Sequence, residues 1–329
     1  MNASDNDDGL IAGIGLTDGA APKELGWDDM SAGRPEGLRL CWLHLDQKEE
    51  RTRSWIKERA GLPEIVAAAL VAEETRPRVQ RFDHGVLVVL RGVNLNPGSD
   101  PEDMVSLRIW VERGLMISVR LRRLIAVQDT LAAIRDGFVP EDTDELLAVL
   151  ADRLFRRMEP VIDDLEERID MVDEQQTSGS VNQSPTELQT LRLRTIILRR
   201  YILPQRDALR HLTADPPAWF ARKTLSSLNE AADRVMRYVE SLDEIRERAM
   251  VIQDTIQNRN SEKLNRRLYI LSVISAICLP LGLLTGLLGI NVAGMPGAET
   301  TWAFWAVTLI MVVIVGLEVW ALKSLKWFK

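Results

Sequence analysis

Two apolar stretches near the end of the chain constrain its structure most strongly. Residues 268–290 are 23 residues without a charged side chain, and residues 302–317 are 16 more before Glu318. At about 1.5 Å of rise per residue, the first stretch forms a helix of roughly 34 Å, enough to cross a hydrocarbon core of about 30 Å. The second reaches a similar length when residues 319–322 are included and Glu318 extends toward the lipid headgroups. We therefore predict a membrane hairpin of two helices.

The alternative is a buried helical hairpin of a soluble protein. It is disfavoured because both stretches are apolar on all sides and the first is long for such a helix. The residues 291–301 between the two stretches contain no Lys or Arg. Basic residues instead lie on the outer flanks, at Lys263, Arg266, Arg267, Lys323, Lys326 and Lys329. This asymmetry places both termini in the cytoplasm and the connecting loop outside.

The remainder of the chain has the composition of a soluble protein, since charged residues make up 27% of the sequence. Residues 1–35 contain many acidic and small residues, and we expect them to form a disordered acidic tail. The two cysteines, Cys41 and Cys278, lie far apart in different predicted environments. No disulfide is therefore expected, in keeping with a reducing compartment.

Short strand-like stretches alternate with helical ones up to about residue 141. The strands are expected at residues 38–45, 85–95, 106–112 and 114–122, from their β-branched and alternating content. The last two are close enough to form a hairpin whose turn contains Gly114, which can adopt a positive φ. Helices are expected near residues 47–60, 63–71 and 127–135.

Long charged helices follow, at residues 142–176 and 186–213, and a third begins near residue 218. No proline interrupts residues 218–279, so the third helix is expected to continue into the membrane. The fold class is thus an α+β membrane protein, whose cytoplasmic α/β domain is followed by a helical stalk continuous with the first of two C-terminal transmembrane helices. The expected parts are a disordered acidic tail (1–35), a cytoplasmic α/β domain (36–141), a helical hairpin (142–216), a stalk and first transmembrane helix (217–290), an external loop (291–301), a second transmembrane helix (302–322) and a basic cytoplasmic tail (323–329).

The stalk carries a seven-residue apolar pattern, which predicts packing against other helices. Its two rows are Leu228, Val235, Leu242, Ala249 and Ile256, and Ala231, Tyr238, Ile245 and Ile252. A row of carboxylates at the same spacing lies on a different face, and its members are Asp233, Glu240, Glu247 and Asp254. This acidic row either is an ordinary solvated face, partly neutralised by Arg234, Arg246 and Arg248, or lines an aqueous vestibule that concentrates cations.

The acidic row continues into the membrane as small or uncharged residues. We expect the narrow path to be lined by Asp254, Ser261, Leu268, Leu271, Ser275 and Gly282. The path would end at Gly289, Ile290 and Asn291, where the last helix carbonyls carry partial negative charge. The Asn291 amide oxygen can accept a hydrogen bond from a hydrated ion. The alternative is that Asn291 only caps the helix. Asn291 and Asp254 are the expected metal contacts.

Ligand types in this path do not select one metal. Zinc favours Cys, His and carboxylate ligands, but the predicted path contains none of the histidines His44, His84 and His211. Cys41 and His44 lie on opposite faces of one predicted strand and are not expected to form a metal pair. Amides, hydroxyls and acids suit hydrated Mg²⁺, Zn²⁺, Ni²⁺ or Co²⁺ about equally, with Cd²⁺ also possible, and no resident cofactor is expected.

Four motifs bear a family resemblance. They are Gly289-Ile290-Asn291 followed by VAGMPG, WLHL at 42–45, TRPRV at 75–79 and RRYILPQRD at 199–207. With these motifs the sequence closely resembles the ZntB-type zinc transporters of the CorA superfamily, from about residue 36 onward. The magnesium channels of that superfamily have Gly-Met-Asn at the first motif. They also have a threonine where this chain has Gly282.

The resemblance implies a homopentamer in the bacterial inner membrane, with a cytoplasmic funnel, a pore-lining long helix and a second helix outside it. By the same resemblance, Asp254 corresponds to an acidic residue at the cytoplasmic pore end and Asn291 to the outer ion-binding asparagine. The resemblance favours zinc uptake, which in the ZntB branch is coupled to protons. A magnesium channel, also passing cobalt or nickel, is the alternative within transport. A membrane-anchored scaffold is the alternative from another class.

No catalytic constellation is present. The sequence lacks a phosphate loop, a nucleophile elbow and a zinc-protease motif, which argues against an enzyme. The formal net charge of −7 argues against a nucleic-acid partner. The expected partners are other copies of the chain, the lipid bilayer and divalent cations.

Replacing Asn291 by alanine separates a pore from an anchor. If Asn291 faces a cation path, Asn291→Ala should strongly reduce divalent cation uptake into liposomes, because the amide oxygen at the outer entrance is lost. If the hairpin is only an anchor, the variant should behave like the unmodified protein. Equal uptake by both proteins, at equal insertion into liposomes, would contradict the pore.

Overall fold

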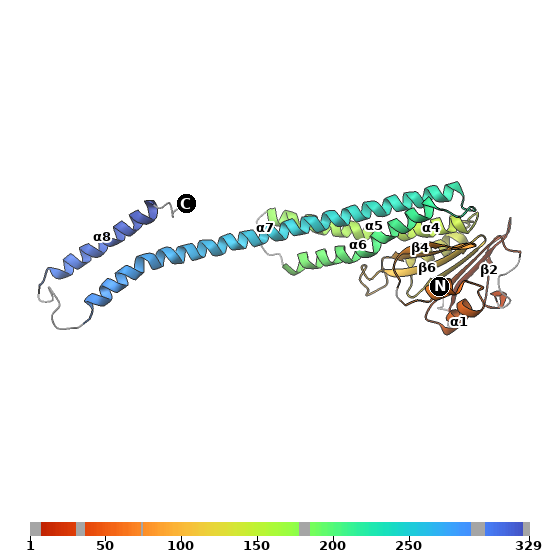
Figure 1. The fold of residues 1–329 in the computed structure, drawn as a ribbon, viewed down its shortest axis with the longest axis horizontal. Coiled ribbons are helices and arrows are strands. Elements are labelled where there is room, and N and C mark those ends of the chain that lie inside the picture. The colour runs from red at the N-terminus through yellow and green to blue at the C-terminus, as the bar shows by residue number, and fades with distance from the viewer. Residues whose placement is uncertain (1–7, 31–36, 74, 178–184, 291–299, 325–329) are drawn as a thin grey trace. The chain divides into compact units, whose positions relative to one another are not determined.

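The computed structural model of the protein describes residues 8–30, 37–73, 75–177, 185–290 and 300–324. The chain divides into two compact units, Met1–Gln253 and Asp254–Lys329. One helix, α7 (Arg222–Leu288), contributes residues to both units and is drawn as a continuous ribbon in Figure 1. Each unit is described by itself.

A mixed β-sheet organises the first unit. Its order is β2-β1-β3-β7-β6-β5-β4, with β3 and β7 parallel and the other neighbours antiparallel. The strands are β1 (Leu10–Leu16), β2 (Lys23–Glu24), β3 (Leu40–Asp46), β4 (Arg78–Arg81), β5 (Gly85–Gly92), β6 (Val105–Glu112) and β7 (Leu115–Arg120). All four predicted strands are therefore confirmed. The predicted hairpin joins β6 and β7, with Glu112 opposite Leu115 and Gly114 at a φ of 71°.

The prediction of a disordered tail at residues 1–35 is wrong for the described residues 8–30. β1 lies inside the sheet between β2 and β3, and Leu16 is fully buried. Gly13 explains why this strand has an unusual composition. A Cβ atom at Gly13 would lie 2.4 Å from the carbonyl oxygen of Leu25, so only glycine fits. The acidic composition of the segment concealed this buried strand.

The edge strand β4 was also missed. Its four residues are mostly exposed, and it pairs only with β5. Such a short and polar strand carries no alternating apolar signal, and charged edge strands resist pairing with other chains. Arg81 at its end forms an ion pair of 2.5 Å with Asp215, after the last residue of α6 (Pro185–Ala214).

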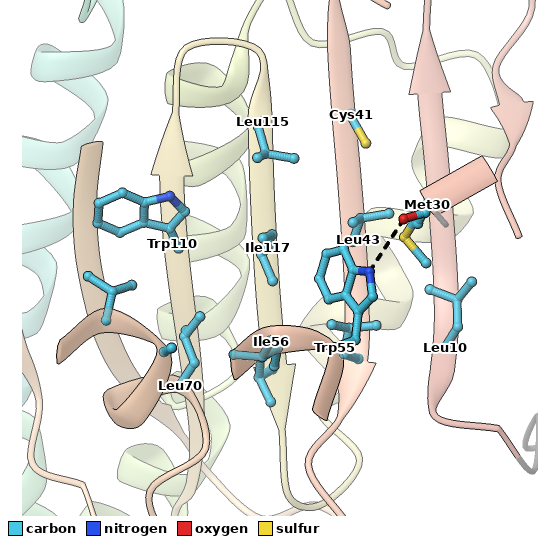
Figure 2. Packing of buried hydrophobic residues seen from close by; sticks show 14 of the residues in the cluster. Leu10, Met30, Cys41, Leu43, Trp55, Ile56, Leu70, Trp110, Leu115 and Ile117 are labelled. Carbon is cyan, nitrogen blue, oxygen red and sulfur yellow. Dashed lines mark hydrogen bonds between the residues drawn. The ribbon is translucent and has the colours of Figure 1, made fainter. Parts of the chain in front are cut away.

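One face of the sheet forms a hydrophobic core with α1 (Glu50–Glu58) and α2 (Glu64–Leu70). Figure 2 shows Trp55 and Ile56 of α1 and Leu70 of α2 pointing toward the sheet residues Leu43 and Ile117. The indole Nε1 of Trp55 donates to the carbonyl oxygen of Met30, in the short 3₁₀ helix Asp28–Met30. The predicted helices near residues 47–60 and 63–71 are thus confirmed.

The opposite face is covered by helices as well, so the central strands are buried on both sides. α3 (Ile125–Arg135) confirms the prediction near residues 127–135, and α4 (Thr143–Arg156) approaches Gly92 of β5 closely through Leu154. The side chains of Trp42 and His44 both contact the Ser118 hydroxyl, at 2.8 Å.

The predicted helix at 142–176 is interrupted. α4 ends at Arg156, and α5 (Glu159–Thr177) begins three residues later. Pro160 provides the physical reason, because proline has no N–H to donate to a carbonyl four residues earlier and restricts the residue before it. The sequence interpretation overlooked this proline. α6 confirms the predicted helix at 186–213.

The long helix is confirmed. α7 has 67 residues, about 100 Å at 1.5 Å per residue. The next helix along the chain is α8 (Ala303–Ser324), with 22 residues. Both helices are long and apolar enough to cross a membrane.

His44 makes the first unit sensitive to acid. Burial, with a smaller contribution from Arg120, lowers the pKa of His44 from 6.5 to about 3. The unfolded chain therefore binds a proton below about pH 6.5 that the folded chain does not bind. As the pH falls between these two values, the free energy of unfolding should fall by about 1.4 kcal/mol per pH unit.

When the pH is lowered from 7.5 to 5.5, the melting temperature of His44→Gln should fall by less than that of the unmodified protein. The exposed His84→Gln serves as the control, and equal acid sensitivity of all three proteins would contradict the role of His44.

Candidate functional site

The first part of α7 has a buried side, as the seven-residue pattern predicts. Eight residues of the two apolar rows are buried, namely Leu228, Ala231, Val235, Tyr238, Leu242, Ile245, Ala249 and Ile252, while Ile256 is half-buried. Ion pairs on either side of these rows join α7 to its neighbours. Arg234 pairs with Asp152 of α4 at 2.5 Å, and Asp243 pairs with Arg199 of α6 at 2.7 Å. The apolar rows of α7 thus pack against helices of the same chain. This packing fixes which side of α7 is exposed.

The predicted acidic row lies on this outer side. Asp233, Glu240, Glu247 and Asp254 are all exposed. Asp233 forms an exposed ion pair with Arg210 at 2.8 Å. Glu240, Glu247 and Asp254 form no ion pair with any residue that the structure describes. Three carboxylates of the row therefore have no ion-pair partner in the described part of the chain.

The arginines next to this row do not neutralise it. Arg234 contacts Asp152, and Arg248 reaches Asp170 of α5 at 2.7 Å. Arg246 contacts Asp243 on its own helix at 3.5 Å. All three guanidinium groups thus pair with carboxylates away from the acidic row. This answers the solvated-face interpretation in part, because its proposed counter-charges are directed elsewhere.

The acidic surface is wider than the sequence interpretation recognised. Residues three and four positions apart share a helix face, and Glu230 and Glu244 are exposed beside the acidic row. Glu230 also lies 3.9 Å from the guanidinium group of Arg234, so its charge is partly compensated. Arg237 is the one basic residue among the exposed positions at 230, 237, 244 and 251. Helical spacing could have identified Glu230 and Glu244 from the sequence. Such a face has a negative potential that attracts cations.

The second part of α7 carries the predicted membrane path. Ser261, Leu268, Leu271, Ser275 and Gly282 are all helical and exposed. A different stripe of the same helix is partly covered, at Tyr269, Val273, Ile277, Pro280, Leu281 and Leu284. Residues two positions apart on an α-helix are separated by about 200° around its axis. Leu271, Ser275 and Gly282 each lie two positions from a residue of the covered stripe, so they point nearly opposite to it. The structure therefore leaves the predicted path side of α7 open.

The outer end of the path is described only up to Ile290. The N–H of Gly289 donates to the carbonyl oxygen of Thr285 at 2.9 Å, which continues the last helical turn. Asn291 lies outside the described residues, and so does most of the predicted external loop. The basic residues Lys263, Arg266 and Arg267 are exposed before the apolar stretch.

Cys41 and the three histidines lie away from α7, whereas Cys278 is exposed on α7. Cys41 and His44 are buried on opposite faces of β3. His84 and His211 are exposed on the first unit. Among the described residues, no three His, Cys, Asp or Glu side chains are grouped as a metal cage. Within the described chain, Glu240, Glu247 and Asp254 are thus carboxylates without an ion pair on the helix that carries the first apolar stretch.

The comparisons with known proteins agree with this arrangement. The family model described as "CorA-like Mg2+ transporter protein" matches residues 37–324. The chain is 36% identical over 326 residues to the divalent cation transporter CmaX of Pseudomonas aeruginosa, covering 98% of each chain. It is 34% identical over 287 residues to the zinc transport protein ZntB of Pectobacterium atrosepticum, covering 87% of this chain and 88% of ZntB. The structure of full-length CmaX matches with a TM-score of 0.84, covering 98% of this chain and 100% of CmaX.

The mixed α/β domain, the long helix α7 with its apolar end and the apolar helix α8, together with the family match, identify a transporter of divalent cations. The chain belongs to the CorA-like family. The family assignment and fold class made from the sequence are confirmed.

The acidic row should control cation access by its charge. Neutralising it with Asp233→Asn, Glu240→Gln, Glu247→Gln and Asp254→Asn together should reduce divalent cation flux severalfold at low ionic strength. The reduction should be smaller at high ionic strength, because the Debye length falls from about 30 Å at 0.01 M to about 3 Å at 1 M. Flux into liposomes at several salt concentrations measures this effect.

The matched control neutralises four exposed carboxylates on α5 instead, by Glu159→Gln, Asp163→Asn, Glu167→Gln and Glu174→Gln. This control removes the same number of charges from another helix and should change flux less. Equal losses at low and high salt, or equal losses in both variants, would support the ordinary solvated face.

Proposed function

We propose that this protein is a zinc uptake transporter of the bacterial inner membrane, built from five copies of the chain. The observation that carries the proposal is the acidic row on α7, in which Glu240, Glu247 and Asp254 form no ion pair with any described residue. The same helix continues into the apolar stretch that begins at residue 268. A cation that binds near this row on the cytoplasmic side, or that leaves the path past the row, stays beside the same continuous helix. The names of the relatives CmaX and ZntB support a divalent cation as the substrate.

Several copies are needed because two membrane helices cannot enclose a pore by themselves. Small residues allow close helix packing in a bilayer, and α7 contains Ser272, Ser275, Gly282 and Gly286 in its apolar stretch. A ring of α7 helices would place the acidic rows around one axis. The like charges in such a ring would repel one another, and bound cations would relieve that repulsion.

The proposed path handles a hydrated ion. Its residues offer amide, hydroxyl and carboxylate oxygens, and Asn291 would form the outer contact once in every copy. Oxygen atoms held in a ring can bind an ion through its water shell without removing it. No resident cofactor is proposed; the metal ion is the substrate.

The orientation follows from the basic residues at the two outer flanks of the hairpin. Lys263, Arg266 and Arg267 precede the first span, and Lys323 follows the second. Both termini would thus be cytoplasmic, and residues 291–301 would face the opposite side. Zinc is preferred over magnesium because ZntB is 34% identical to this chain. The magnesium channel is the second candidate, favoured by the oxygen-only ligands and by the Mg²⁺ in the family description.

Uptake into liposomes tests the ion and its driving force. We expect the reconstituted protein to take up zinc faster than magnesium at equal concentrations, and an inward proton gradient to increase zinc uptake. Asn291→Ala and protein-free liposomes are the controls for specific flux. Faster magnesium uptake would support the second candidate, and zinc uptake that is indifferent to the pH gradient would contradict proton coupling.

A further inference from the structure

Glu318 is an acidic residue within an apolar helix and has no part in the proposed path. It lies six residues before the end of α8, after a long uncharged stretch of that helix. Its Oε2 atom is shielded from solvent and has no hydrogen-bond partner among the residues that the structure describes. A carboxylate at such a depth needs a polar partner, because lipid tails offer none.

α8 has a partly covered stripe that contains Glu318. The side chains at Ala303, Val307, Met311, Ile314, Glu318 and Ala321 are partly covered, while Leu317, Val319 and Trp320 are exposed. The spacing of three and four residues places the stripe on one side of the helix. Glu318 therefore points to the same side of α8 as the partly covered apolar residues.

The covered stripes of α7 and α8 match in antiparallel register. If Tyr269 lies opposite Glu318, then Val273 lies opposite Ile314 and Leu284 opposite Ala303. In the same register, residue 276 lies opposite Met311, which is one residue from Ile277. Apart from residue 276, all of these side chains are partly covered. Two helices that cross a bilayer in opposite directions place these pairs at equal depth.

We infer that Glu318 accepts a hydrogen bond from the Tyr269 hydroxyl, and that this polar contact holds the inner half of α8 against α7. The inference rests on the proposed crossing of the membrane by both helices. Tyrosine has an O–H that can donate to a carboxylate. Arg266, one turn nearer the cytoplasm, is exposed, so Tyr269 is the donor inside the apolar stretch.

The contact lies on the side of α7 that faces away from the proposed path. Leu271 is two residues from Tyr269, and Ser275 is two residues from Val273, which is about 200° around the helix in each case. Glu318 is therefore a positioning residue for the pore helix and does not bind the transported ion. Polar contacts between membrane helices stabilise one packing arrangement over others.

Disulfide cross-linking tests the register without measuring transport. In a full-length protein with Cys41→Ala and Cys278→Ser, the test pairs are Tyr269→Cys with Glu318→Cys, and Val273→Cys with Ile314→Cys. The control pair is Tyr269→Cys with Trp320→Cys, at similar depth on another side of α8. A protease site inserted within residues 291–299 separates α7 from α8 unless a disulfide joins them. After oxidation in native membranes, the fraction of joined fragments should be severalfold higher for both test pairs than for the control.

The Val273–Ile314 pair then reports on the polar contact itself. Glu318→Leu should lower its cross-linked fraction severalfold, whereas Glu318→Gln should keep it, because the amide oxygen can still accept from Tyr269. Equal joining of test and control pairs, or disulfides only between separate chains, would overturn the register. An unchanged fraction in Glu318→Leu would overturn the polar contact. Neither outcome depends on whether the protein transports zinc.

Discussion

The continuity of α7 is the constraint on which the rest of the structure depends. The helix contains no glycine before Gly282 and no proline before Pro280, so its hydrogen-bond ladder runs without a break through the charged part. The angular positions of all side chains along it are then linked. Burial of the apolar rows against α4, α5 and α6 therefore sets where the acidic row points.

Charge on α7 is distributed by its neighbours as well as by its own composition. α7 carries arginines close to Asp233, Glu240 and Glu247, and composition alone would suggest a balanced surface. Aspartates on α4 and α5 accept two of these arginines, Arg234 and Arg248. These ion pairs are partly exposed and contribute little stability themselves. Their consequence is electrostatic, because Glu240 and Glu247 are left without an ion-pair partner among the residues that the structure describes.

Much of the fold could be predicted from local patterns. The central strands and long helices were recognised because apolar periodicity is strong where both faces or one stripe are buried. β1 was missed because its glycines and acidic flanks resemble a linker, although Gly13 is required by a close backbone approach. The break between α4 and α5 was missed at Pro160.

The predicted path residues lie on α7 as expected. On an ideal straight helix, however, residues spaced by seven drift around the axis by about 20° with each heptad. Spacing alone therefore could not show that the row keeps to one face.

The sequence by itself determined the two apolar helices, the unbroken stalk and the row of carboxylates, because hydropathy and helical spacing are local properties of the chain. The tertiary structure decided which carboxylates remain unpaired. Arginines of α7 pair with aspartates on α4 and α5, and arginines of α6 pair with aspartates on α7, all distant in sequence. It also decided that residues 10–16 belong to the sheet and that Glu318 shares a side of α8 with partly covered apolar residues. Pairing and burial depend on which surfaces meet, and no local pattern contains that information.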